Sequence, residues 1–151
     1  MRRKDREITD RDTINNIIGR CKVCRIALCD DGQPYVLPLN FGYDGEYLYF
    51  HSANDGKKIE ILKKNNRVGF ELDILNAIIT DETPCEWGAK YESVVGTGIA
   101  EFMGSRREKA KSFECILSQY GGAFNKFKDS SLSSVTIIRV TIVSISGKEK
   151  K

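Results

Sequence analysis

Hydrophobic and polar positions alternate along the first half of the chain in three short runs. The runs cover residues 24–29, 35–41 and 46–51. Alternation with a period of two is typical of β-strands, and the Asp-Gly pairs at 31–32 and 44–45 suit tight hairpins. The pattern predicts a three-stranded antiparallel meander. Pro38 lies in the middle run and donates no ladder hydrogen bond, so it indicates a bulge or an unpaired position.

Three further strands are predicted in the rest of the chain. They cover residues 67–74, 91–103 and 135–146. The first places Val68, Phe70 and Leu72 on one face by strict alternation. Gly96 and Gly98 in the second indicate a bend or a close approach by another backbone.

Three short helices are predicted from apolar residues three and four positions apart. They cover residues 10–18, 56–65 and 105–120. Asn54 or Asp55 is expected to cap the second helix, and Ser105 with Glu108 forms a capping-box pattern at the third. The expected buried stripe of the third helix is Ala110, Phe113, Leu117 and Tyr120. Six strands with few helices predict a small β-barrel, formed as one domain over residues 1–151.

Composition and charge agree with a soluble globular protein. The chain has 151 residues, of which 40% are hydrophobic and 30% charged, and its net charge is +3. Basic residues are interspersed with acids, so we expect no nucleic-acid partner. No apolar run reaches the roughly 18 residues of a membrane span, and no signal peptide precedes the five cysteines. We therefore expect a cytoplasmic protein that does not contact membranes.

Several familiar site patterns are incomplete. Cys21 and Cys24 have redox or zinc spacing, but Cys24 enters a strand, and no second ligand pair accompanies them. We expect core cysteines and no metal. There is no Gly-x-Ser-x-Gly motif, and Gly96-Thr97-Gly98 lacks the third glycine of a dinucleotide fingerprint.

One segment has the features of an anion site. A strand ends at His51 and Ser52, a loop with Gly56 follows, and Lys57 and Lys58 open a helix. Free N–H groups at a helix start attract anions, and the lysines add full charges. The segment fits a terminal phosphate, although paired lysines at a helix start also occur on ordinary surfaces.

The motifs together resemble a known family. They are residues 35–41, 48–53, 56–58, 65–71, 85–87 and 91–98. Their order and spacing resemble the pyridoxamine 5'-phosphate oxidase-like split barrels that bind FMN, in particular the 5-nitroimidazole-resistance (Nim-type) branch. The resemblance runs from about residue 1 to residue 147. It implies a six-stranded split β-barrel and a homodimer with two FMN molecules at the subunit interface.

The resemblance also implies cofactor-binding positions. The flavin would lie against the strand with Val36, Leu37, Pro38, Leu39 and Asn40. Its phosphate would lie near Lys57 and Lys58, with His51 and Ser52 nearby. Tyr91 and Ser93 fall where the next strand of the family meets the cofactor.

Two interpretations of His51 remain open. One is a packing or pocket histidine that makes a single hydrogen bond, and the other is a catalytic residue that supplies a proton or positions substrate. Trp87 is expected to pack. Tyr35 and Asn40 stand where pyridoxamine 5'-phosphate oxidase itself has basic residues, and its C-terminal arginine motif has no counterpart here. Pyridoxamine phosphate is therefore not the expected substrate.

The expected function is that of an FMN-dependent oxidoreductase acting on a small organic compound. Its most concrete form is a nitroimidazole or nitroaromatic reductase that takes electrons from a nicotinamide nucleotide. In such proteins the flavin performs the electron transfer, and the chain supplies binding and orientation. The alternatives are a non-catalytic barrel that binds flavin or haem, and a barrel with a purely interaction role.

Overall fold

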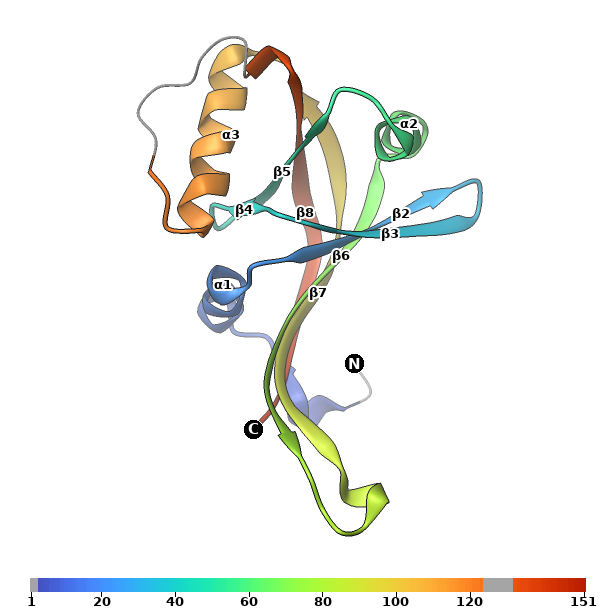
Figure 1. Cartoon of the computed structure of the whole chain (residues 1–151), viewed down its shortest axis with the longest axis vertical. Helices are drawn as coiled ribbons and strands as arrows, with labels where there is room; N and C mark the ends of the chain where they lie inside the picture. The colour runs from blue at the N-terminus through green and yellow to red at the C-terminus, as the bar shows by residue number, and fades with distance from the viewer. Residues whose placement is uncertain (1–2, 124–131) are drawn as a thin grey trace.

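The computed structural model describes residues 3–123 and 132–151 (Figure 1). This part of the chain contains eight strands and three α-helices. The strands are β1 (Glu7–Ile8), β2 (Cys24–Asp30), β3 (Gln33–Leu39), β4 (Gly42–Tyr43), β5 (Tyr47–Ala53), β6 (Arg67–Ile79), β7 (Gly88–Met103) and β8 (Val135–Lys150). The helices are α1 (Arg11–Arg20), α2 (Lys57–Lys64) and α3 (Arg106–Gln119), and the 3₁₀ turns are η1 (Lys4–Arg6) and η2 (Pro84–Glu86).

The eight strands form one antiparallel sheet in the order β3-β2-β6-β7-β8-β5-β4, and β1 pairs with β8. The mainly β class with few helices is confirmed. The predicted number of six strands is wrong for this sheet, because β1 and β4, two residues each, join the six long strands. Strands this short carry too little alternation to be recognised in a sequence.

The predicted meander is only half correct. β2 and β3 form a hairpin at Asp31 and Gly32, which have φ angles of 49° and 86°. β3 does not pair with β5, whose partners are β4 and β8. The chain turns inward between the two strands. Phe41 is fully buried there, and Gly42 lies so close to α3 that an added Cβ would be 2.5 Å from the Ile116 nitrogen.

Pro38 marks an edge and not a bulge. It lies opposite Arg25 in an unbroken register between β2 and β3. β3 is the outermost strand on its side of the sheet, so the missing N–H costs no ladder bond.

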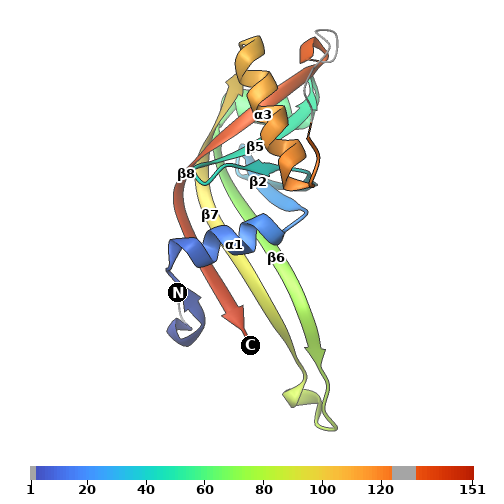
Figure 2. The ribbon, with the colours of Figure 1, turned by 90° about the vertical axis from the view of Figure 1, so that its left-hand side faces the viewer.

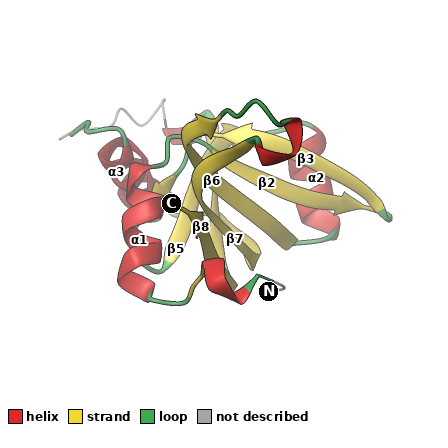
Figure 3. Cartoon of the chain, turned by 90° about the horizontal axis from the view of Figure 1, so that it is seen from below, coloured by secondary structure: helices red, strands yellow, loops and turns green. Residues whose placement is uncertain are grey.

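The core lies on the concave face of the curved sheet. Its largest fully buried side chains include Phe50, Leu72, Ile26 and Ile138. α1, which was predicted over residues 10–18, closes this core with Ile14, Ile17 and Ile18. A second cluster lies under α3 and contains Tyr49, Met103, Ile116 and Ile137. Figure 3 shows α1 and α3 on one side of the strands and α2 on the other.

The helices differ from their predictions in two respects, the N-cap of α2 and the buried face of α3. The N-cap of α2 is Gly56, with φ 108° and no side-chain cap, and not Asn54 or Asp55. The capping box of Ser105 and Glu108 is confirmed. The buried positions of α3 are Ser112 and Ile116, whereas Ala110, Phe113 and Leu117 of the predicted stripe are half-buried and Tyr120 is exposed. The Tyr120 hydroxyl accepts a hydrogen bond from Phe41 N and donates one to Lys22 O.

Gly96 and Gly98 are close-approach positions, as predicted. A Cβ on Gly96 would collide with the Phe70 ring and with Ser144 O, and one on Gly98 would lie 2.5 Å from Val140. The register of β7 and β8 also shifts between Thr97 and Gly98. The described residues include no helix long and apolar enough to span a membrane.

Candidate functional site

The loop between β5 and α2 presents an uncapped helix start. Gly56 adopts a left-handed φ, which favours glycine, and turns the chain into the helix. Gly56 has no side chain and so makes no cap hydrogen bond to the first turn of α2. The positive end of the helix dipole is therefore available to an anion beside Lys57 and Lys58.

Lys57 links this helix start to the edge strand β3. Its Nζ lies 5.0 Å from the centroid of the Tyr35 ring. The contact brings the start of α2 next to the strand on which the flavin was predicted to lie. Two segments that are more than 20 positions apart in the sequence therefore meet at one end of the barrel.

Lys58 is half-buried and forms no ion pair within the described residues. Burial lowers the pKa of its ammonium group, because the charged form loses hydration. A bound anion would reverse this effect by stabilising the charge. The Lys58 charge also affects His51. Burial is the larger cause that lowers the pKa of His51, and the nearby Lys58 charge is the smaller one.

His51 lies on the face of β5 that α3 covers. Its ring stacks on Phe113, with centroids 5.8 Å apart and planes 21° from parallel. The neighbouring Phe50 points into the main core on the opposite face. Burial and the nearby Lys58 charge hold the pKa of His51 below its ordinary value of 6.5, so both favour the neutral imidazole. A neutral imidazole can donate one hydrogen bond and accept another.

The predicted residues of β3 divide between two faces. Leu37 and Leu39 pack against the core, whereas Val36 and Pro38 are exposed on the other face, and Asn40 is exposed just beyond the strand. Ser52 is half-buried near the end of β5, opposite Thr136 of β8. Side chains from β3 thus offer a flavin an apolar exposed surface at the sheet edge.

Tyr91 and Ser93 lie far from His51 along the sheet of the same chain. His51 is in register with Ile137 and, through it, with Met103 of β7. Tyr91 is twelve positions away from Met103, or about 40 Å along the strand. Lys148 borders both predicted residues, with its Nζ 5.6 Å from the Tyr91 ring and its carbonyl 3.5 Å from Ser93 Oγ. The register places Pro38 of β3 level with Val95 of β7, so within one chain Tyr91 and Ser93 lie closer to the level of β3 than to that of His51.

The cysteines of the Cys-x-x-Cys pair are buried. Burial is the main cause that raises the pKa of Cys21 to about 11 and that of Cys24 to about 12. Neither thiol is ionised at neutral pH, so neither is a ready nucleophile or metal ligand. Both side chains belong to the main core, as predicted.

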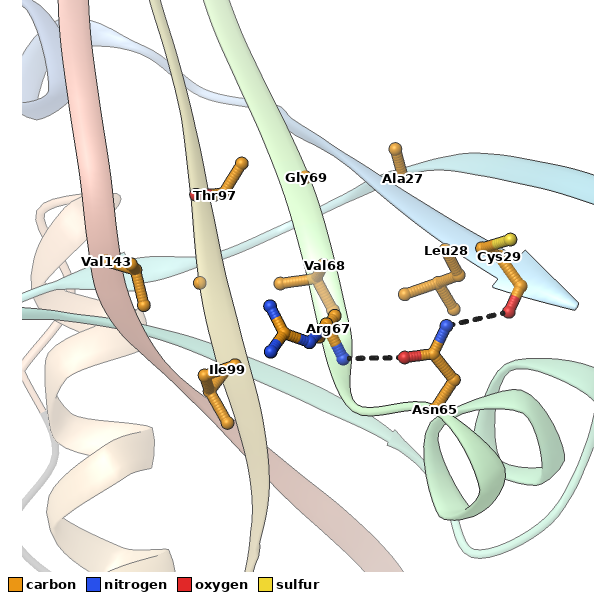
Figure 4. A pocket seen from close by; sticks show the side chains of 11 residues that line it. Ala27, Leu28, Cys29, Asn65, Arg67, Val68, Gly69, Thr97, Ile99 and Val143 are labelled. Atoms are coloured by element: carbon orange, nitrogen blue, oxygen red, sulfur yellow. Dashed lines mark hydrogen bonds between the residues drawn. The ribbon is translucent and has the colours of Figure 1, made fainter. Parts of the chain in front are cut away.

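Sequence reasoning missed a hollow of about 410 Å³ on the convex face of the sheet. We call it the outer hollow, and its lining includes Ala27, Cys29, Arg67, Thr97, Ile99 and Val143. Figure 4 shows Thr97, Ile99 and Val143 on one side of Arg67, and Cys29 and Asn65 on the other. No predicted site residue lines it, although Ala27 is the partner of Val36 in the sheet. No local sequence pattern indicates it, because its lining comes from four separate stretches of the chain.

The sequence model of the pyridoxamine 5'-phosphate oxidase family matches residues 10–149 of the chain. A curated relative, an uncharacterised protein of Rhizobium meliloti, is 28% identical over 65 residues. That match covers 43% of this chain and 42% of the relative.

Solved structures share the fold over most of its length. A candidate 5-nitroimidazole antibiotic resistance protein from Bacteroides thetaiotaomicron is 30% identical, with a TM-score of 0.85 over 94% of this chain and 85% of that one. An FAD-binding protein from Mesorhizobium loti is 26% identical, with a TM-score of 0.72 over 97% and 98%. An FAD- and haem-binding protein from Mycobacterium smegmatis, 16% identical, has a TM-score of 0.84 over 97% and 74%, which shows the fold alone. The chain belongs to the pyridoxamine 5'-phosphate oxidase family.

Proposed function

We propose that the protein is a flavin-dependent oxidoreductase that binds FMN at the end of the barrel where β3, β5 and α2 meet. The observation that carries this proposal is the contact of Lys57 with Tyr35, which joins the uncapped start of α2 to the edge strand β3. Membership of a family with flavin-binding structural neighbours supports the same cofactor class.

The donor set at this end of the barrel fits a phosphate group. Lys57 and Lys58 supply two cations without acidic partners among the described residues, and the first turn of α2 supplies uncapped N–H groups. The hydroxyl of Ser52 is a further donor near the end of β5. Charge-assisted bonds of this kind are the strong ones in phosphate recognition.

The chain would hold the flavin ring beside the exposed Val36 and Pro38 of β3. Bound flavin supplies hydride or electron transfer, and the protein orients the ring and its substrate. Because burial and Lys58 lower the pKa of His51 and favour its neutral form, its role in the proposal is to hydrogen-bond a substrate or the cofactor.

A second copy of the chain completes the proposed site. Tyr91 and Ser93 lie twelve and ten positions along β7 from the level of His51, about 40 and 33 Å in an extended strand, so within one chain they are far from the His51 end of the proposed site. We therefore propose a homodimer with two FMN molecules at its interface. The proposed substrates are small nitroaromatic compounds such as nitroimidazoles, with a nicotinamide nucleotide as reductant.

A non-catalytic module that binds flavin or haem is the second candidate. The observation that favours the haem version is His51, the single histidine of the chain, which is neutral and partly exposed. Neutral imidazole is the form that ligates haem iron. A Soret band in the purified protein, lost in His51→Ala, would favour this candidate over the first.

The visible absorption spectrum of the purified protein tests the proposal. We expect flavin bands corresponding to about one FMN per chain, and bleaching by a nicotinamide nucleotide followed by reoxidation with a nitroimidazole. Protein that is colourless and does not bind added FMN contradicts the flavin assignment. Bound FMN with no turnover would support the non-catalytic module.

Two lysine variants test the position of the phosphate. Lys57→Ala and Lys58→Ala should each weaken FMN binding by about tenfold or more, since a hydrogen bond to a charged group contributes about 1.5–3 kcal/mol. Lys63→Ala removes an exposed lysine near the other end of the same helix and should leave the affinity unchanged. Equal affinities in all three variants would contradict the assignment.

A further inference from the structure

The hairpin between β6 and β7 extends beyond the rest of the sheet. β2 pairs with β6 only from Gly69 to Glu71, and β8 pairs with β7 no further than Tyr91. Residues 76–90, which we call the arm, therefore form a ribbon with no third strand (Figures 1 and 2). An isolated two-stranded ribbon is only marginally stable in water, so the arm lacks the cover that the barrel strands have.

The arm is apolar on its exposed surface. Ile78 and Trp87 each keep 56% of their surface exposed, and Leu75 at the base of the arm keeps 58%. Trp87 is nevertheless fixed, because its Nε1 donates to the carbonyl of Asp81 at 2.7 Å. A large aromatic side chain that is held in place but uncovered is typical of a contact surface.

The tip of the arm is also acidic. Asp81, Glu82 and Glu86 lie there, and no lysine or arginine occurs from Leu75 to Ala89. None of the three carboxylates forms an ion pair with another described residue. The surface that covers the arm should therefore be apolar with a positive charge.

The outer hollow has this complementary character. Arg67 is the one charged side chain among its lining residues, and its guanidinium has no ion-pair partner in the described parts of the chain. Ala27, Ile99 and Val143 supply apolar surface around it, and Val143 is 67% exposed.

We propose that the arm tip of one copy of this chain docks in the outer hollow of a second copy. Trp87 covers the apolar lining, and Glu82 and Glu86 face Arg67 of the second copy. A chain cannot make this contact with itself, because Arg67 and Ile79 stand at opposite ends of β6, about 40 Å apart. Figure 1 likewise shows the arm at the far end of the molecule from α2, which ends beside the hollow.

A two-fold axis makes the contact reciprocal. Each chain carries both an arm and a hollow, so one symmetric dimer fills two hollows and covers two arms. The inference rests on the homodimer of the proposed function but not on its cofactor, since neither the arm nor the hollow contains the proposed phosphate ligands.

Two native cysteines allow a direct test. Cys85 is exposed at the arm tip, and Cys29 is exposed at the outer hollow. A mixture of ¹⁵N-labelled and unlabelled protein is treated with bismaleimidoethane, and the cross-linked peptides are identified by mass spectrometry. We expect Cys29–Cys85 links between labelled and unlabelled copies, and their loss in both Cys29→Ser and Cys85→Ser.

The failures of the two proposals are distinguishable. A protein that sediments as a monomer, or as a dimer without Cys29–Cys85 links, overturns arm docking whatever its colour. A colourless protein with these links overturns the flavin assignment and leaves arm docking in place.

A charge exchange gives a second readout. Arg67→Glu, and separately the pair Glu82→Lys with Glu86→Lys, should each raise the dimer dissociation constant by about tenfold or more, as close charge pairs at interfaces do. All three changes together should restore much of the lost affinity. Lys63→Glu is the matched control for a charge reversal on a nearby exposed lysine. An unchanged dimer dissociation constant in all of these charge-reversal variants contradicts the proposal.

Discussion

The barrel and the arm are parts of the same two strands, but different surroundings hold them in place. In the barrel, β6 and β7 lie between other strands and place Phe70, Leu72 and Val94 in a closed core. In the arm, the same strands pair only with each other and expose Ile78 and Trp87. Side chains fix the barrel from within, so it can position a cofactor. In the proposed dimer, the arm is covered by the surface of a second copy.

The largest contrast is expected between two aromatic residues. Phe50→Ala removes a fully buried ring and should lower the free energy of unfolding by about 3–5 kcal/mol at every protein concentration. Trp87→Ala should change it by about 0.5 kcal/mol or less where the protein is monomeric. Its effect should grow only at concentrations where a dimer forms. Denaturant unfolding over a range of concentrations measures both.

The comparison is contradicted if Trp87→Ala lowers the free energy of unfolding as much as Phe50→Ala does, at every protein concentration. That result would place the arm within the cooperative core of a single chain.

Two glycines give a smaller contrast. In the barrel, Gly96→Ala directs a methyl group at the Phe70 ring and the Ser144 carbonyl. This change should lower the free energy of unfolding by about 1–3 kcal/mol. In the arm, Gly88→Ala meets the mobile end of Lys150, 2.6 Å from the new Cβ. That lysine can move aside, so the expected change is within about 0.5 kcal/mol. Thermal unfolding of the two variants ranks them, and equal losses would contradict the distinction.

The smallest expected effect concerns the single histidine. Its one imidazole C2–H resonance should titrate below the ordinary pKa of 6.5, because burial and Lys58 disfavour the charged form. Lys58→Met should raise this pKa, whereas Lys63→Met at the far end of α2 should not. A wild-type pKa at or above 6.5 would contradict the assigned environment.

The same shift predicts a pH dependence of stability. A histidine whose pKa is lower in the folded state stabilises the fold above its unfolded pKa, and that contribution is lost as the pH falls below about 6.5. His51→Gln should therefore lose less stability than the wild type between pH 7 and pH 5. Parallel denaturant titrations at the two pH values measure the difference.

Local sequence patterns predicted the positions of strands and helices better than they predicted which strands pair. Alternation located the six long strands, and the capping box located the start of α3. The pairing of β5 with β8 was not predictable from such patterns, because it joins segments about 90 residues apart. The ends of β6 and β7 were missed as well. Beyond Ile74 the residues no longer alternate between a core face and a solvent face, because the arm has no core.

The candidate site divides in the same way. Gly56, Lys57 and Lys58 form one continuous segment, so local spacing and family resemblance could identify them. The contact of Lys57 with Tyr35 depends on how α2 lies against the sheet edge, and no sequence pattern encodes it. Arg67 looked like an ordinary strand residue until the register placed Ala27, Thr97 and Val143 around it.

The central claim is that this chain holds the phosphate of a flavin at the start of α2. The most direct measurement is a paired titration of flavin-free protein with FMN and with riboflavin, which differ only in that phosphate. We predict that FMN binds at least about tenfold more tightly, and that Lys57→Ala and Lys58→Ala reduce this ratio without weakening riboflavin binding. Equal affinities for FMN and riboflavin in the wild-type protein would contradict the claim.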